Sequence, residues 1–124
     1  MILGVGLDLC DVGRIGRALN NPRFLQRIYT ERERSQIERG GAQTAAGLFA
    51  AKEAVAKALG TGFSGFMPWD VEVARDDLGR PCAALSRGAL ARMEALGGRS
   101  VLVSITHSGG FAAAVAILTD EEPV

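Results

Sequence analysis

The segment from Thr44 to Leu59 constrains the fold more than any other part of the chain. It is rich in alanine, the strongest helix former, and Gly60 follows where glycine commonly ends a helix. We therefore predict a long helix at this position. Because 124 residues make about one domain, we expect this helix to be central to a single domain covering residues 1–124.

The first residues predict a strand whose two faces differ in kind. Leu3, Val5, Leu7 and Leu9 alternate with Ile2, Gly4, Gly6 and Asp8. Glycines leave space on the second face, and two interpretations of that space stay open. Another backbone packs closely against the strand, or Asp8 stands in a cleared functional site at the strand end.

The rest of the chain mixes short helices and strands without strict alternation, which favours an α+β domain with a small antiparallel sheet. Capping and turn residues mark the expected boundaries. We expect helices over 11–28 (broken near Asn20-Asn21-Pro22), from Thr30 to the Gly40-Gly41 pair and from Ser86 to Leu96. We expect strands over 69–74 and over 81–85, the second of them at a sheet edge, and a hairpin of 101–106 and 111–118 with a loop of three to four residues. The last six residues should form a frayed tail.

Charge and hydropathy argue against a nucleic-acid-binding, a membrane-spanning and a secreted protein. Lys plus Arg and Asp plus Glu both number 14, so no net field favours nucleic acid or an anionic membrane. The longest apolar run, residues 111–118, is too short for a membrane span, and the N-terminus lacks the basic start of a secretory signal. We expect a cytoplasmic protein in which Cys10 and Cys82 are buried free thiols. One segment is nevertheless basic: residues 12–30 contain no acidic residue and include Arg14, Arg17, Arg23 and Arg27, a local patch suited to an acidic partner.

The long helix carries the first candidate for chemistry. Glu53 and Lys57 are four residues apart and share a helix face; the plain alternative is a surface ion pair. Asp8 and Glu53 could together hold a Mg²⁺ ion, which prefers oxygen ligands and keeps waters and phosphate oxygens.

Two further features are weaker signals. The glycine-rich loop Gly60–Gly65 follows a helix instead of a strand, so it is not a dinucleotide-binding fingerprint, although approach of its amides to a phosphate stays open. His107 is the only histidine, which excludes His-pair metal motifs, and a lone histidine at a hairpin mouth is more often a turn residue than a catalyst.

Four motifs, in order from residue 2 to about residue 118, resemble the holo-acyl-carrier-protein synthase family, the small bacterial 4′-phosphopantetheinyl transferases. They are Gly4-Val-Gly6-Leu-Asp8 with Arg14-Ile15, Phe49-Ala-Ala-Lys52-Glu53 running on to Lys57-Ala-Leu-Gly60-Thr-Gly62, Trp69-Asp-Val-Glu-Val with Gly79-Arg-Pro81, and Val103-Ser-Ile-Thr-His107.

The resemblance implies transfer of the phosphopantetheine arm of coenzyme A to a serine of apo acyl carrier protein, in fatty-acid biosynthesis. It implies Mg²⁺ as cofactor and a homotrimer with active sites between subunits. From the balanced charge and the short apolar runs, we expect no nucleic-acid or membrane partner. By position, the resemblance assigns Asp8 and Glu53 as metal ligands and, with Lys57, as catalytic residues; Lys57, Gly60, Gly62, Pro81, Thr106 and His107 as coenzyme-binding; and Arg14, Arg17, Arg23 and Arg27 as the carrier-protein docking face.

The chain departs from the family pattern at three places. Leu48 stands where the family usually has a basic residue, the segment 40–43 is short and lacks lysine and arginine, and Phe111 stands where many members have tyrosine. Arg39 is a candidate replacement for the missing contacts to the coenzyme's 3′-phosphate. Two alternatives stay open: an inactive trimeric nucleotide-binding module, and a Mg²⁺-dependent diphosphate hydrolase.

Overall fold

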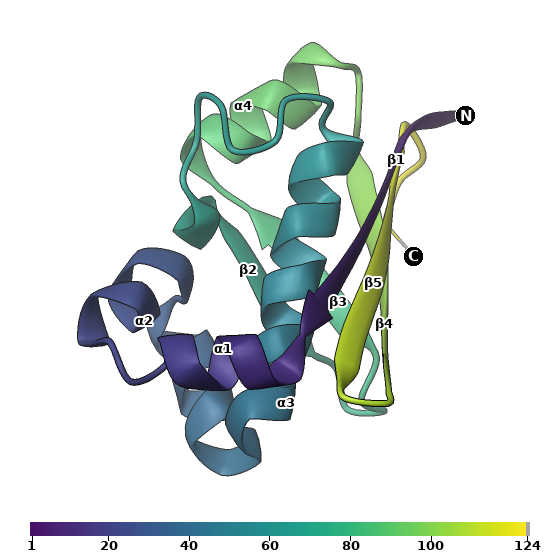
Figure 1. Ribbon diagram of the computed structural model, residues 1–124. Coiled ribbons are helices and arrows are strands. Elements are labelled where there is room, and N and C mark those ends of the chain that lie inside the picture. The colour runs from purple at the N-terminus through teal and green to yellow at the C-terminus, as the bar shows by residue number, and fades with distance from the viewer. Residues whose placement is uncertain (124) are drawn as a thin grey trace.

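The structure is a computed structural model that describes residues 1–123, and one long helix crosses the inner face of its antiparallel sheet (Figure 1). This confirms the α+β expectation. In chain order the elements are β1 (Ile2–Asp11), α1 (Val12–Ala18), α2 (Pro22–Ile28), α3 (Glu31–Ala58), the short 3-10 helix η1 (Pro68–Asp70), β2 (Val71–Arg75), β3 (Pro81–Leu85), α4 (Arg87–Ala95), β4 (Ser100–Ser108) and β5 (Phe111–Thr119).

The sheet has five strands in the order β1-β5-β4-β3-β2. The expectation that residues 81–85 form an edge strand is therefore wrong: β3 lies between β4 and β2, although it pairs with β4 at Cys82 and Leu102 alone. The β4–β5 turn has only two residues, Gly109 and Gly110, instead of three to four. Both have positive φ (58° and 82°), as the tightest hairpin turns require.

Helix α3 joins two helices that the sequence predicted separately. Thr30 and Glu33 form the expected capping box at its start: the Thr30 hydroxyl accepts from the Glu33 N–H, and the Glu33 carboxylate accepts from the Thr30 N–H. The break at Gly41 (φ 71°, ψ −154°) is also confirmed, but as a kink and not as a loop. The two halves of α3 therefore point in different directions.

The glycines of β1 let α3 lie directly against the sheet. A Cβ added to Gly6 would be 1.8 Å from the Ala54 carbonyl oxygen, and one added to Gly4 would be 2.1 Å from that of Ala58. Neither position can hold a side chain without moving the helix. The close-packing interpretation of these glycines is confirmed, and alanines on α3 allow it from the other side.

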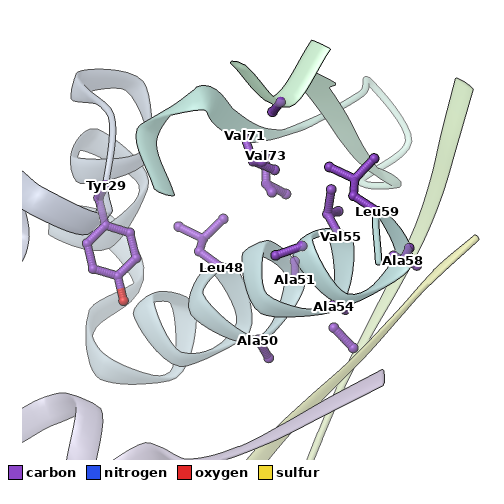
Figure 2. Packing of buried hydrophobic residues seen from close by; sticks show 14 of the residues in the cluster. Tyr29, Leu48, Ala50, Ala51, Ala54, Val55, Ala58, Leu59, Val71 and Val73 are labelled. Carbon is purple, nitrogen blue, oxygen red and sulfur yellow. The ribbon is translucent and has the colours of Figure 1, made fainter. Parts of the chain in front are cut away.

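The core lies between α3, the sheet and the helices that follow β1. Figure 2 shows Leu48 on α3 directed toward Val71 and Val73 of β2, with the Tyr29 ring close by. Leu48 is only 2% exposed. The residue that stands where the family usually has a basic side chain is therefore part of the core.

No helix of residues 1–123 covers the outer face of the sheet (Figure 1). The alternating apolar side chains of β1 point to this side: Val5 is 59% exposed, and Leu7 and Leu9 are each 65% exposed. Leu102 on β4 and Phe111 on β5 add to the exposed apolar surface. The strand thus turns Val5, Leu7 and Leu9 outward and its glycines to the core, the reverse of an ordinary half-buried strand.

Of two predicted helix N-caps, one is confirmed and one is wrong. Asp11 caps α1 by accepting from the Arg14 N–H, as expected, whereas the Ser86 hydroxyl donates to the Asp70 carbonyl and does not cap α4.

The predicted frayed tail is anchored at Asp120, whose carboxylate pairs with the N-terminal ammonium at 2.6 Å. Val124 lies outside the described residues.

The two cysteines are free, as expected, but they differ in exposure. Cys82 is exposed, which corrects the expectation that it is buried. Cys10 is half-buried, with its thiol directed at the Ala46 carbonyl, and burial raises its pKa to about 11.

Candidate active site

Three of the predicted site residues meet where β1 crosses the second half of α3. The Lys57 ammonium donates to Asp8 Oδ1 at 3.1 Å and to the Leu7 carbonyl oxygen at 3.0 Å. Lys57 is half-exposed, whereas the Asp8 side chain is only 15% exposed. The space left by Gly6 allows this approach, so the glycine face of β1 serves both interpretations: it packs closely, and it presents Asp8 to the helix.

Glu53 lies one helical turn before Lys57 and close enough to Asp8 for their charges to interact. Burial is the main cause that raises the pKa of Glu53, the negative charge of Asp8 raises it further, and Lys57 opposes both. Glu53 borders a small cavity of about 10 Å³, and the other residues that line it are Ile28, Phe49, Lys52, Phe63 and Pro68. Two carboxylates that repel each other in a partly dry site are suited to a divalent cation between them.

The glycine-rich loop, residues 60–65, follows the end of α3, the helix that carries Glu53 and Lys57. The Gly60 N–H donates to the Lys57 carbonyl and the Gly62 N–H to that of Ala56, so the loop continues from the end of α3. Gly60 and Gly62 both have positive φ (80° and 60°), which explains why glycine stands at each. Arg92 of α4 donates to the Leu59 carbonyl, and this hydrogen bond connects the start of the loop to α4.

The other residues predicted to bind the coenzyme lie elsewhere in the chain. His107 is on β4 and Asp8 on β1, with β5 between them, and strands are spaced about 4.8 Å apart. The His107 Nε2 lies 2.9 Å from the Gln43 carbonyl oxygen, at the kinked part of α3. Pro81 is on β3, one strand further away. Within one chain, the structure therefore does not bring these residues to the Asp8–Glu53–Lys57 cluster.

The four arginines of the predicted docking face are all exposed. Arg14 and Arg17 lie on α1, and Arg23 and Arg27 on α2. Within residues 1–123, none of the four forms an ion pair with an acidic side chain. Their charge is free to meet an acidic partner.

Sequence reasoning missed a buried ion pair next to the site. Lys52 Nζ lies 2.7 Å from Glu33 Oε1, and both side chains are at most 1% exposed. Lys52 also donates to the carbonyls of Pro68 and Val71, and Glu33 accepts from the Val73 N–H. No spacing rule links residues 33 and 52, because the kink of α3 brings them together.

In the part of the chain that the structure describes, no group of three or more His, Cys, Asp or Glu side chains could hold a metal. Asp8 and Glu53 are a pair, so a cation held there needs further ligands from a substrate or from water. A search of residues 1–123 also finds no helix long and apolar enough to cross a membrane.

The site is thus made of two carboxylates, a lysine and a glycine loop on an α+β fold, a set suited to binding and polarising a phosphate or diphosphate group with a divalent cation. Residues 4–116 match the model of the 4′-phosphopantetheinyl transferase superfamily, and the chain belongs to that family.

Relatives and solved structures agree with this assignment. Holo-[acyl-carrier-protein] synthase of Solidesulfovibrio magneticus is 50% identical over 121 residues, which cover 95% of this chain and 98% of that protein. That of Clostridium acetobutylicum is 44% identical with the same coverage. The Helicobacter pylori synthase in complex with coenzyme A superposes with a TM-score of 0.83 at 28% identity, covering 93% of this chain and 99% of that one. The Bacillus anthracis synthase, described with coenzyme A (3′,5′-ADP), has a TM-score of 0.82 at 36% identity, covering 98% and 99%.

Proposed function

We propose that this protein transfers the 4′-phosphopantetheine arm of coenzyme A to a serine of apo acyl carrier protein and releases adenosine 3′,5′-bisphosphate. The observation that carries the proposal is the Asp8–Glu53–Lys57 cluster, placed beside a glycine loop in a chain of this family. The serine hydroxyl forms a bond to the β-phosphorus of the coenzyme, and the bond from that phosphorus to the bridging oxygen breaks. The bisphosphate leaves with that oxygen.

Mg²⁺ fits the pair of carboxylates, because burial is the main cause of the raised pKa of Glu53 and the negative charge of Asp8 adds to it, and a divalent cation would offset that repulsion. Asp8 and Glu53 would hold it, and when bound it would neutralise charge on the diphosphate oxygens. Lys57 would contribute a second positive charge, at the distance of one hydrogen bond from Asp8. Glu53 would also accept the serine proton.

A homotrimer would complete the site. Asp8, Glu53 and Lys57 are separated from Thr106 and His107 within one chain, so a second copy could supply the latter pair. The uncovered apolar face of the sheet, with Val5, Leu7 and Leu9, is a surface that association would bury. In this assembly, α1 and α2 would present the four exposed arginines to an acidic carrier protein.

Mass spectrometry of the carrier protein tests the proposal. Incubation of the protein with apo acyl carrier protein, coenzyme A and Mg²⁺ should add about 340 Da to the carrier protein, the mass of the phosphopantetheine arm, with the ion acting on the diphosphate. The adduct should be absent without Mg²⁺. Cleavage of coenzyme A without an adduct would instead identify a diphosphate hydrolase. Coenzyme binding with neither reaction would identify a binding module.

A further inference from the structure

Helix α4 has no role in the proposed function, yet it contacts the segment 60–67 at its start, its middle and its end. This segment is the glycine-rich loop with the two residues that follow it, and it begins shortly after Lys57 (Figure 1). Gly60, Gly62 and Gly65 within it all have positive φ. Three such glycines give the free segment many accessible conformations, so contacts from outside are needed to hold one of them.

The first contact ties the start of the segment to α4. Arg92 Nε donates to the Leu59 carbonyl oxygen at 3.0 Å. The same guanidinium reaches Gly60, because a Cβ added there would be 3.5 Å from Arg92 Nη2. Within residues 1–123, Arg92 forms no ion pair with an acidic side chain, so its guanidinium is directed to the backbone at the end of α3.

The second contact is a close approach of α4 to the middle of the segment. A Cβ added to Gly88 would be 2.5 Å from the Gly65 carbonyl oxygen and 2.9 Å from the Phe66 Cβ. Phe66 is itself only 6% exposed. The first turn of α4 therefore lies directly on the segment, at the place where the segment is also fixed to the core.

The third contact is an ion pair at the end of the segment. The buried Asp70 carboxylate accepts from the Met67 N–H at 3.1 Å and from Arg87 Nε at 2.7 Å. Within residues 1–123, Arg87 is the only residue other than glycine with a positive φ (45°). That conformation is unfavourable for a residue with a Cβ, so surrounding contacts must hold it, and the ion pair with Asp70 is one of them.

Each contact has an ordinary explanation when it is taken alone. An arginine near the last carbonyls of a helix stabilises its C-terminal end, which would account for Arg92. An ion pair at the start of a helix would account for Arg87. What these explanations leave out is that all three contacts of α4 meet one segment, and that this segment carries Gly60 and Gly62.

We propose that Arg92 and Arg87 are positioning residues, which hold segment 60–67 in the conformation that receives the coenzyme beside Lys57. The inference rests on the proposed function, because it takes the coenzyme as the ligand of this segment. The two arginines act through the segment and do not contact the coenzyme. A segment that is already ordered loses less conformational entropy on binding, so loosening it weakens the affinity.

Calorimetric titration with coenzyme A and with adenosine 3′,5′-bisphosphate, which lacks the β-phosphate and the pantetheine arm, tests this role. Arg92→Met and Arg87→Met should weaken coenzyme A binding about tenfold and leave bisphosphate binding unchanged. Arg92→Lys keeps a donor for the Leu59 carbonyl and should restore most of the affinity. Arg99→Met removes an exposed arginine outside α4 and should change neither affinity.

Hydrogen exchange of the free protein reports on the segment without any ligand. The N–H groups of residues 60–67 should exchange faster in Arg92→Met and Arg87→Met than in the wild type, because local opening becomes easier. Those in the middle of α3 should exchange as before. Arg87→Met leaves the Asp70 carboxylate buried without its cation, so Arg92→Met, which leaves no such charge, is the decisive variant if the first fails to fold.

Two results would overturn the proposal. One is wild-type exchange and wild-type coenzyme A affinity in both variants. The other is equal weakening of coenzyme A and bisphosphate binding, which would indicate general damage to the fold. If the wild type binds coenzyme A with the expected differences but does not modify the carrier protein, the proposed function fails and the positioning role stands.

Discussion

At the scale of single residues, Glu53, the proposed metal ligand, lowers the stability of the fold when it is ionised. Its carboxylate is partly buried among aromatic side chains and repelled by Asp8, so its pKa is raised above the ordinary value of 4.5. Between the ordinary and the raised pKa the folded state binds more protons than the unfolded chain. The free energy of unfolding therefore falls as the pH rises through that window, and ionised Glu53 lowers stability above it.

We expect Glu53→Gln to reduce carrier-protein modification more than tenfold while raising the melting temperature at pH 7 without Mg²⁺. The substitution removes the unfavourable charge and keeps the shape of the side chain. The gain should disappear in acid, where Glu53 is protonated in both states. Modification assays at saturating Mg²⁺ and thermal melts across pH measure the two effects; retention of more than a tenth of wild-type turnover would contradict the role as ligand.

Two lysines five residues apart on α3 should respond oppositely to the same substitution. Lys52 is buried and paired with Glu33, and its removal leaves an uncompensated buried carboxylate, a loss of about 3–5 kcal/mol of stability. Lys57 is half-exposed and contacts Asp8, so Lys57→Met should keep the melting temperature within a few degrees and lower turnover at every Mg²⁺ concentration. Urea denaturation and turnover measured on both variants check the pair; equal loss of stability would disprove the separation of roles.

At the scale of elements, the contact between β1 and α3 positions the whole site. The backbones approach so closely that Gly6→Ala must displace the helix that carries Glu53 and Lys57. We expect a loss of about 1–3 kcal/mol of stability, as for overpacked cores. Gly13→Ala on α1 is the control, because its Cβ would meet side-chain atoms and no backbone: Asp11 Oδ1 at 3.2 Å and Arg17 Nη1 at 3.5 Å. Denaturant unfolding compares the two, and a neutral Gly6→Ala would show that the helix can move freely.

At the scale of the whole molecule, the uncovered sheet face argues for association. A trimer should sediment at about 39 kDa, three copies of the 13.0 kDa chain in closed symmetry. Val5→Glu places a charge on the outer face and should shift the mass toward the monomer and lower activity with it. Leu78→Glu, in a turn where the side chain is 96% exposed, should change neither. An active Val5→Glu monomer would exclude sites shared between subunits.

We expect the arginine face on α1 and α2 to act at the same scale, through long-range charge. Arg14→Glu should raise the KM for acyl carrier protein about tenfold, or 1.4 kcal/mol, with little change in the KM for coenzyme A. The wild-type KM for the carrier protein should also rise with salt, since exposed charges are screened within about 8–10 Å. Steady-state kinetics with each substrate varied will measure both; equal effects on the two KM values would indicate a damaged active site instead.

Local signals in the sequence determined much of this fold. The Thr30–Glu33 capping box, the glycine break at residue 41 and the Asp11 cap acted as predicted, because each depends on residues within one or two turns. The Glu53–Lys57 spacing and the alternation of β1 likewise predicted which residues share a face of the helix or the strand. These features need no knowledge of distant contacts.

Tertiary structure decided the features that depend on contacts between residues far apart in the sequence. Only the assembled fold shows that Leu48 is in the core, that Lys52 is paired with Glu33, and that Asp8 and His107 lie on strands separated by β5. It also turned Val5, Leu7 and Leu9 of β1 outward, because the glycine face lies against α3. Periodicity tells which residues share a face, but packing against other elements decides which face is buried.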